Sequence, residues 1–152
     1  ASSPRTSETP AWSRATRAKL PSSISVRTSN PIVPVRDVGA TAAFYRDTLG
    51  FDVRTLMDDG SFALVARDQA GVSLVRGDEA ALHATRNNIS AYIWVKDLDA
   101  LWDELSPKLN SLEEGRVRTP FTQSYQMREF HVKDPDGFLI FFGEDADQTG
   151  ED

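Results

Sequence analysis

The histidines are the residues of this chain that could most readily carry catalysis, but their sequence settings do not favour it. The sequence holds two histidines and no cysteine, which excludes thiolate metal sites, disulfides and cysteine nucleophiles. His83 falls in a polar stretch, residues 77–88, which we interpret as an exposed connector. His131 alternates with Glu129 and Lys133, as on the polar face of a strand. General acid–base catalysis would require a partner of matched pKa within reach.

The serines and the acidic turn offer no catalytic motif either. Ser61, Ser73 and Ser90 have no neighbouring motif that would activate a nucleophile. The Asp-Pro-Asp-Gly sequence at residues 134–137 is followed by apolar residues and lacks the alternating oxygens of a calcium loop, so it predicts a turn. No glycine-rich phosphate loop occurs. We therefore predict no catalytic residue and no cofactor.

An internal repeat indicates two similar modules. The tetrad Val-Arg-Asp-Val at residues 35–38 recurs as Val-Lys-Asp-Leu at residues 95–98. Each tetrad ends an apolar stretch and precedes a helical pattern, at residues 39–49 and at residues 99–109. The aspartate of each tetrad can accept hydrogen bonds from the free N–H groups at the start of its helix.

Strand-like runs follow each predicted helix. They cover residues 51–57, 61–67 and 72–76 in the first half, and residues 116–119, 128–133 and 138–143 in the second half. Each half therefore predicts a β-α-β-β-β module. The predicted fold class is α+β, with two such modules forming curved mixed sheets around a concave cleft. The domain is expected over residues 30–145, with modules at about 30–78 and 88–145.

Charge separates this expected domain from its ends. The 152 residues, sufficient for one domain, include 17 Lys+Arg and 23 Asp+Glu, for a net charge of −6. Residues 1–29 are basic and rich in Ser, Thr and Pro, which predicts a disordered tail or, alternatively, a transit peptide. Residues 146–152 predict an acidic tail. The acidic balance argues against nucleic-acid binding, and no run is long enough to span a membrane. Because no secretory apolar core is present, a cytoplasmic location is expected.

Three segments resemble a known family. They are NPIVPVRDVGATAAFYRDTLGF at residues 30–51, AYIWVKDLDALWDEL at residues 91–105, and MREFHVKDPDGFLIFFGE at residues 127–144. In this order they resemble the vicinal oxygen chelate superfamily, also called the glyoxalase/bleomycin resistance/dioxygenase family. Within it the chain is most similar to bleomycin resistance proteins, which share the aromatic-x-Trp-Val strand and the Arg-Glu-Phe sequence before Asp-Pro. The resemblance implies an acidic homodimer that binds a cationic drug between subunits without chemistry.

The same resemblance implies where a family metal would bind. Metal-dependent members present His, Gln or Glu from four strands, and the matching positions here are Asn30, Leu74, Ser90 and Phe141. Leucine and phenylalanine cannot ligate a metal, and neither histidine falls on a ligand position. The resemblance therefore implies a site without metal, even if the alignment is shifted by one residue.

The resemblance also brings aromatic residues to the concave face. The implied ligand-binding residues are Phe62, Tyr92, Trp94, Tyr125, Phe141, Asn30 and Ser90. The rings would form a stacking platform for a flat, cationic ligand, although ordinary core or dimer packing would also explain them. Glu129 could add negative charge to the rim, or could form a structural pair with Arg128. Gln126 stands where relatives usually carry a glycine, which suggests an unusual backbone angle there.

Three functions remain open from the sequence. The leading hypothesis is a metal-free protein of the bleomycin resistance type that sequesters a cationic aromatic antibiotic at a dimer cleft. A metal-dependent enzyme of the glyoxalase or dioxygenase kind is the first alternative, and the non-ligating residues at the metal positions argue against it. The second alternative is an interaction domain whose cleft is filled by its own side chains, which a cavity below about 300 Å³ would favour.

Overall fold

The computed structural model describes residues 29–147. Its elements, in chain order, are β1 (Ile32–Val35), α2 (Val38–Asp47), β2 (Asp52–Leu56), β3 (Phe62–Arg67), β4 (Ala70–Arg76), α3 (Glu79–Asn88), β5 (Ser90–Trp94), α4 (Leu98–Leu109), β6 (Val117–Thr122), β7 (Met127–Lys133) and β8 (Leu139–Asp145). The predicted basic tail before Ser29 and the end of the predicted acidic tail lie outside the described residues.

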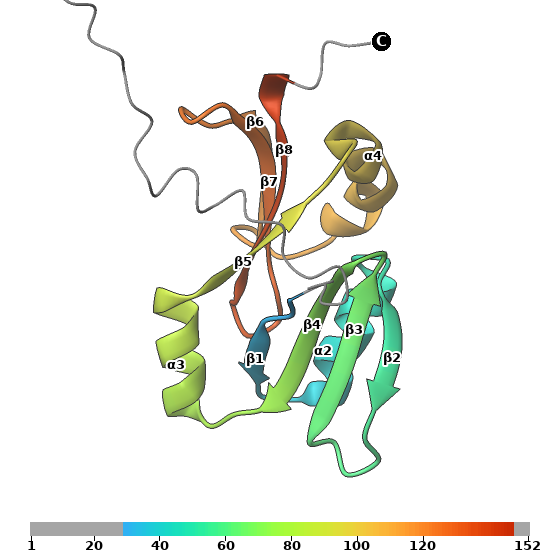
Figure 1. Cartoon of the computed structure of the whole chain (residues 1–152). Coiled ribbons are helices and arrows are strands. Elements are labelled where there is room, and N and C mark those ends of the chain that lie inside the picture. Colours follow the sequence, from blue (N-terminus) through green and yellow to red (C-terminus); the bar gives the residue numbers. More distant parts are fainter. Residues whose placement is uncertain (1–28, 148–152) are drawn as a thin grey trace, which may run out of the picture.

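The strands form two four-stranded mixed sheets of the same topology. The first sheet has the order β1-β4-β3-β2 and the second has the order β5-β8-β7-β6. In each sheet the first strand pairs in parallel with the last, and the other pairs are antiparallel. Figure 1 shows the two sheets as separate halves of the molecule, each with its own helix. The predicted α+β fold of two β-α-β-β-β modules is therefore confirmed.

Short polar motifs set the ends of the two module helices. The Asp37 side chain accepts a hydrogen bond from the Ala40 N–H at the start of α2, and Asp97 accepts one from the Ala100 N–H at the start of α4. Just after α2, Gly50 has φ +72°, a left-handed angle that glycine adopts without strain. The capping predicted from the repeated tetrads is thus confirmed.

The segment between the modules, which the sequence predicted only as an exposed connector, forms helix α3. Asp78 caps α3 by accepting from the Ala81 N–H, and the helix buries only Leu82 and Thr85. Because most of its residues are polar, its apolar periodicity is too weak to be seen in the sequence. His83 lies exposed on this helix, as expected for a connector.

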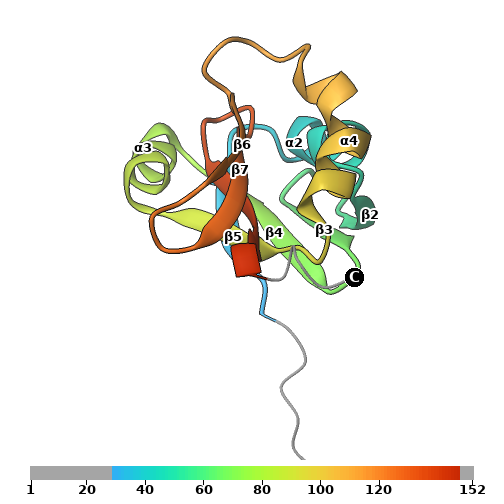
Figure 2. The same cartoon turned by 90° about the horizontal axis from the view of Figure 1, so that it is seen from above.

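One apolar core joins the two modules. Helices α2 and α4 lie on the same side of the molecule, opposite α3 (Figure 1 and Figure 2). The inner faces of both sheets contribute to a single buried cluster that includes Val33, Tyr45, Leu74, Phe130 and Phe142. Strand alternation therefore places the other side chains of each sheet on its opposite face, where α3 packs beside β1 of the first sheet.

Polar contacts also link the modules. The Arg36 backbone N–H donates to the Asp136 carboxylate (3.0 Å), and the Arg86 guanidinium donates to the Asp136 carbonyl (2.8 Å). On the other side, Arg67 of β3 pairs with Glu104 of α4. No described helix has the length and apolar character needed to cross a membrane.

Candidate functional site: the outer face of the second sheet

Successive side chains of β5 and β8 point alternately to the core and to the outer face of the second sheet. Ala91 and Ile93 face the core, whereas Tyr92 and Trp94 face away from α4. On β8, Ile140 and Phe142 are buried in the core, while Phe141 points to the outer face. This alternation places Tyr92, Trp94 and Phe141 together.

The Tyr92 side chain crosses the sheet from β5 to β7. Its ring lies nearly parallel to that of Phe141, with centroids 5.9 Å apart. Its hydroxyl passes over Gly143 of β8 and donates to Glu129 of β7 (3.0 Å). A Cβ atom at Gly143 would lie only 2.0 Å from the Tyr92 hydroxyl oxygen. Glycine is therefore required at position 143 for this path.

Glu129 is the centre of this face. Its carboxylate accepts four hydrogen bonds, from Tyr92 (3.0 Å), Tyr125 (2.7 Å), Gln123 (3.1 Å) and His131 (2.9 Å). The residue is 0% exposed. A buried carboxylate is costly unless hydrogen bonds satisfy it, and these four donors supply them.

Electrostatics of the cluster follow from these bonds. Burial would raise the pKa of Glu129, but the hydrogen bonds from His131, Tyr125, Gln123 and Tyr92 together hold its pKa below the usual range. Burial, followed by the bond to this carboxylate, raises the pKa of Tyr92 well above its usual value. The bond to Glu129 also raises the pKa of Tyr125. At neutral pH the face thus holds an ionised carboxylate and two neutral phenols.

Further rings extend the face around the cluster. The centroid of the His131 ring lies 4.0 Å from that of Phe141 and 5.1 Å from that of Phe121. The Arg118 guanidinium lies 3.5 Å above the Phe121 ring, within cation–π range. The rings of Trp94 and Tyr92 have centroids 5.3 Å apart, and Trp94 is 70% exposed. This exposure leaves a large aromatic surface open to a ligand or to another chain.

Tyr125 belongs to the tight turn that joins β6 to β7. The Gln123 N–H donates to the Met127 carbonyl (2.7 Å), and the Gln126 N–H donates to the Gln123 carbonyl (3.1 Å). Gln126 has φ +63°. The unusual backbone angle suspected at position 126 is confirmed, with glutamine in a conformation that favours glycine.

Glycine at position 126 should stabilise this turn. We expect the variant Gln126→Gly to exceed Gln126→Ala in free energy of unfolding by about 0.5–1 kcal/mol, because only alanine keeps the left-handed strain. Urea unfolding of the two variants would measure the difference. Equal stabilities would show that the turn carries no such strain.

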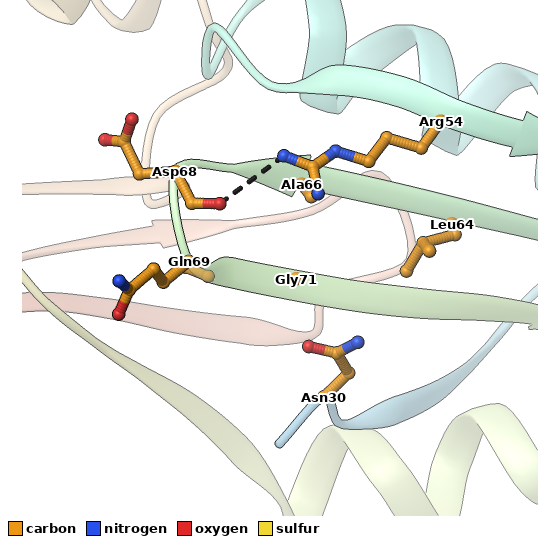
Figure 3. A pocket seen from close by; sticks show the side chains of 8 residues that line it. Asn30, Arg54, Leu64, Ala66, Asp68, Gln69 and Gly71 are labelled. Atoms are coloured by element: carbon orange, nitrogen blue, oxygen red, sulfur yellow. Dashed lines mark hydrogen bonds between the residues drawn. The ribbon is translucent and has the colours of Figure 1, made fainter. Parts of the chain in front are cut away.

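The first sheet contributes a separate hollow of about 390 Å³. It is lined by Asn30, Arg54, Leu64, Ala66, Asp68, Gln69, Ala70 and Gly71. Figure 3 shows Asn30 beside Gly71, and Arg54 donating to the Asp68 carbonyl. A Cβ atom at Gly71 would lie 2.7 Å from the Asn30 side-chain oxygen, so this glycine makes room for the amide.

The predicted ligand residues thus divide between two sheets. Tyr92, Trp94, Phe141 and Tyr125 gather around the Glu129 cluster, and Ser90 is exposed at the start of the same sheet. Asn30 lies in the hollow of the first sheet, and Phe62 lies on β3 in that sheet. The structure does not bring Phe62 into ring contact with the second-sheet aromatics among the described residues.

Sequence reasoning missed the cluster itself. Glu129 was considered as a rim charge or as a partner of Arg128, but Arg128 lies on the other face and pairs with Asp99 (2.8 Å). His131 was correctly placed beside Glu129 on one strand face, yet its contact with that residue was not inferred. Gln123 carried no signal. Glu129, two residues from His131 in a period-two pattern, was the one available clue.

The sequence model of the Glyoxalase/Bleomycin resistance protein/Dioxygenase superfamily matches residues 27–142. This chain belongs to that superfamily. The membership predicted from the three segments is confirmed. A comparison with curated protein sequences gave no match.

Several solved structures are similar to this fold. The bleomycin-binding protein from bleomycin-producing Streptomyces verticillus, complexed with copper(II)-bleomycin, is 28% identical, with a TM-score of 0.63 over 78% of this chain and 96% of that one. A bleomycin resistance determinant encoded on the transposon Tn5 is 21% identical, with a TM-score of 0.65 over 79% and 98%. The antibiotic-binding protein TnmS3 from Streptomyces sp. CB03234 is 23% identical, with a TM-score of 0.61 over 81% and 98%. The last two likenesses support the fold alone.

Of the four positions that the resemblance matches to a family metal, namely Asn30, Leu74, Ser90 and Phe141, Leu74 does not lie on the outer face of its sheet. Leu74 is fully buried in the core, whereas its neighbour Ser73 lies on the outer face of β4. A shift of one residue moves a side chain to the other face of the sheet. Serine is no more acidic than leucine, so the donor set at these positions stays poor. Among residues 29–147, no group of three His, Asp or Glu side chains is placed to hold a metal ion.

Proposed function

We propose that this chain is a metal-free binding protein of the bleomycin resistance type, which sequesters a cationic aromatic antibiotic. The observation that carries the proposal is the aromatic face built around Glu129 and left open at Trp94 and Tyr125. Flat ligands gain from stacking on such rings, and cationic ligands gain from both the rings and the negative charge. A 28% identical protein of the same fold holds a bleomycin complex, which supports this ligand class.

Trp94 of the binding face also borders a hollow, which supports a ligand over a filled, vestigial cleft. Besides the hollow of the first sheet, one of about 620 Å³ lies between the β3–β4 turn and the start of α4, with Trp94 in its wall. Both exceed the volume of about 300 Å³ at which small-molecule sites begin.

We further propose that a second copy completes the binding cleft. Several large apolar side chains besides the site aromatics are exposed in a single chain, namely Ile32, Leu56, Met57 and Ile89. Exposed apolar groups of this kind are typical of surfaces that another chain covers. Light scattering at micromolar concentration is expected to give twice the chain mass of 16.8 kDa. A monomer would contradict the shared cleft.

Titration of metal-free bleomycin, followed by calorimetry, tests the binding function. We expect saturation at one drug per chain. The variant Trp94→Ala should bind about tenfold or more weakly, because stacking and burial of this ring together exceed the 1.4 kcal/mol that a factor of ten represents. The matched control is His83→Ala, which alters an exposed side chain on α3. Absence of heat at high drug concentration would exclude bleomycin as the ligand.

A further inference from the structure

The carboxylate of Glu129 is fully occupied by its protein partners. One oxygen, Oε1, accepts from the hydroxyls of Tyr92 and Tyr125, and the other, Oε2, accepts from Gln123 and His131. A carboxylate offers about four acceptor positions, so these bonds use its capacity. The residue is also shielded from solvent. A ligand on this face therefore meets the tyrosines and does not meet Glu129.

The orientation of the tyrosine hydroxyls decides what a ligand meets. A phenolic hydroxyl has a single proton and otherwise acts as an acceptor. Both protons point at Glu129, because the carboxylate can only accept. The side chains of Tyr92 and Tyr125 are 38% and 56% exposed. Their oxygens can thus offer only lone pairs to a bound molecule.

The buried charge strengthens these acceptors. Hydrogen bonds to an ionised group are shorter and stronger than neutral ones, and chains of hydrogen bonds polarise one another. The bond between Tyr125 and Glu129, at 2.7 Å, is of this kind. Gly143 keeps the second bond in place by leaving a path for Tyr92. The hydrogen bonds to ionised Glu129 therefore make the two phenol oxygens on the open face stronger hydrogen-bond acceptors.

We propose that Glu129 is a positioning residue that makes this face selective for aromatic ligands carrying N–H donors, such as amidinium or ammonium groups, which bind to the oxygens of Tyr92 and Tyr125. Aromatic anions are disfavoured at these two oxygens, because their acceptor groups would meet acceptors, and the Arg118 guanidinium on this face already lies over the Phe121 ring. The inference deepens the proposed function and rests on its binding face. The selectivity arises because both tyrosine hydroxyl protons point at Glu129 and leave only acceptor lone pairs for a ligand.

Two fluorescent aromatic probes of opposite charge test this selectivity. The diamidine DAPI carries N–H donors, and pyrene-1-sulfonate carries an anionic acceptor group and no N–H donor. We expect the intact chain to bind DAPI at least about tenfold more tightly than pyrene-1-sulfonate, the equivalent of one lost charge-assisted hydrogen bond. Equal affinities, or no binding of either probe, would overturn the inference.

Variants then separate hydroxyl direction from overall charge. In Glu129→Gln the amide can donate, so at least one hydroxyl proton can turn outward, and the preference for DAPI should fall about fivefold or more. Glu144→Gln is the matched control, because Glu144 is a buried glutamate near the end of β8 that accepts from the Leu98 N–H on the opposite face. It removes the same charge and should keep the preference.

Tyrosine variants keep the test decisive if Glu129→Gln does not fold. Tyr92→Phe and Tyr125→Phe preserve the rings and the net charge, and together they should remove most of the preference. An unchanged preference in the double variant would overturn the inference. If the double variant keeps the preference while the intact chain binds bleomycin tightly, the inference fails and the proposed function stands. If the preference depends on the tyrosines but bleomycin does not bind, only bleomycin is excluded as the ligand. The two failures are therefore distinguishable.

Discussion

Replacing Gly143 with alanine should lower the free energy of unfolding by about 2–3 kcal/mol, although a strand glycine normally gains stability from this change. The new Cβ atom would lie 2.0 Å from the Tyr92 hydroxyl oxygen and 2.6 Å from the ring carbon that bears it. Tyr92 would have to leave its place above β8. The protein would then lose a hydrogen bond to the buried carboxylate of Glu129.

A double-mutant cycle isolates this clash. In a Tyr92→Ala background the obstacle is absent, so Gly143→Ala should have no cost or should slightly stabilise the strand. Urea unfolding of the four proteins would give the coupling energy between the two positions. A cost for Gly143→Ala that is the same in both backgrounds would contradict the role of Gly143 as the passage for Tyr92.

Asp134→Asn should stabilise the protein at neutral pH by about 2–3 kcal/mol and have little effect near pH 4. Asp134 is 1% exposed in the turn between β7 and β8. One of its oxygens accepts from the N–H groups of Asp136 and Phe138. Within residues 29–147, the other oxygen has no hydrogen-bond partner, and the buried Tyr45 hydroxyl has none either. Burial raises the pKa of Asp134 to about 6 despite the two backbone hydrogen bonds.

The direction of the pH dependence follows from the raised pKa. Between about pH 4 and pH 6 the folded protein retains a proton that the unfolded chain has released, so this group lowers stability as the pH rises. Above about pH 6 the full cost of the buried charge is present. Asparagine keeps the accepting oxygen and carries no charge. Unfolding of both proteins should be measured from pH 4 to pH 8. The difference in free energy of unfolding should grow between about pH 4 and pH 6 and then stay level, and a difference that is constant throughout would contradict the raised pKa.

The sequence alone determined the architecture of this protein. The repeated tetrads, with Asp37 and Asp97 as caps, located both module helices, and the alternation along residues 90–94 separated the core face from the outer face. These are local signals: a cap depends on three or four residues, and alternation depends on the period of a strand. The three segments that matched the superfamily carried the same information in their order and spacing.

The structure differs from the sequence predictions at two places. Helix α3 buries only Leu82 and Thr85, so the apolar periodicity of this polar segment is weak. The resemblance matches Leu74 to a metal position, but strand pairing places Leu74 in the core and its neighbour Ser73 on the outer face of β4.

The tertiary structure decided the chemistry of the site. Tyr92, Gly143 and Glu129 lie on three adjacent strands, and strand pairing brings positions 37 residues apart into hydrogen-bonding distance. No local pattern encodes such a contact, because it depends on the register of β5 against β8 and of β8 against β7. The burial of Asp134 and the satisfaction of Glu129 likewise depend on which elements pack over them. Residue types could suggest an aromatic and acidic face, but only the fold determines that its carboxylate is buried and which way the tyrosine hydroxyls point.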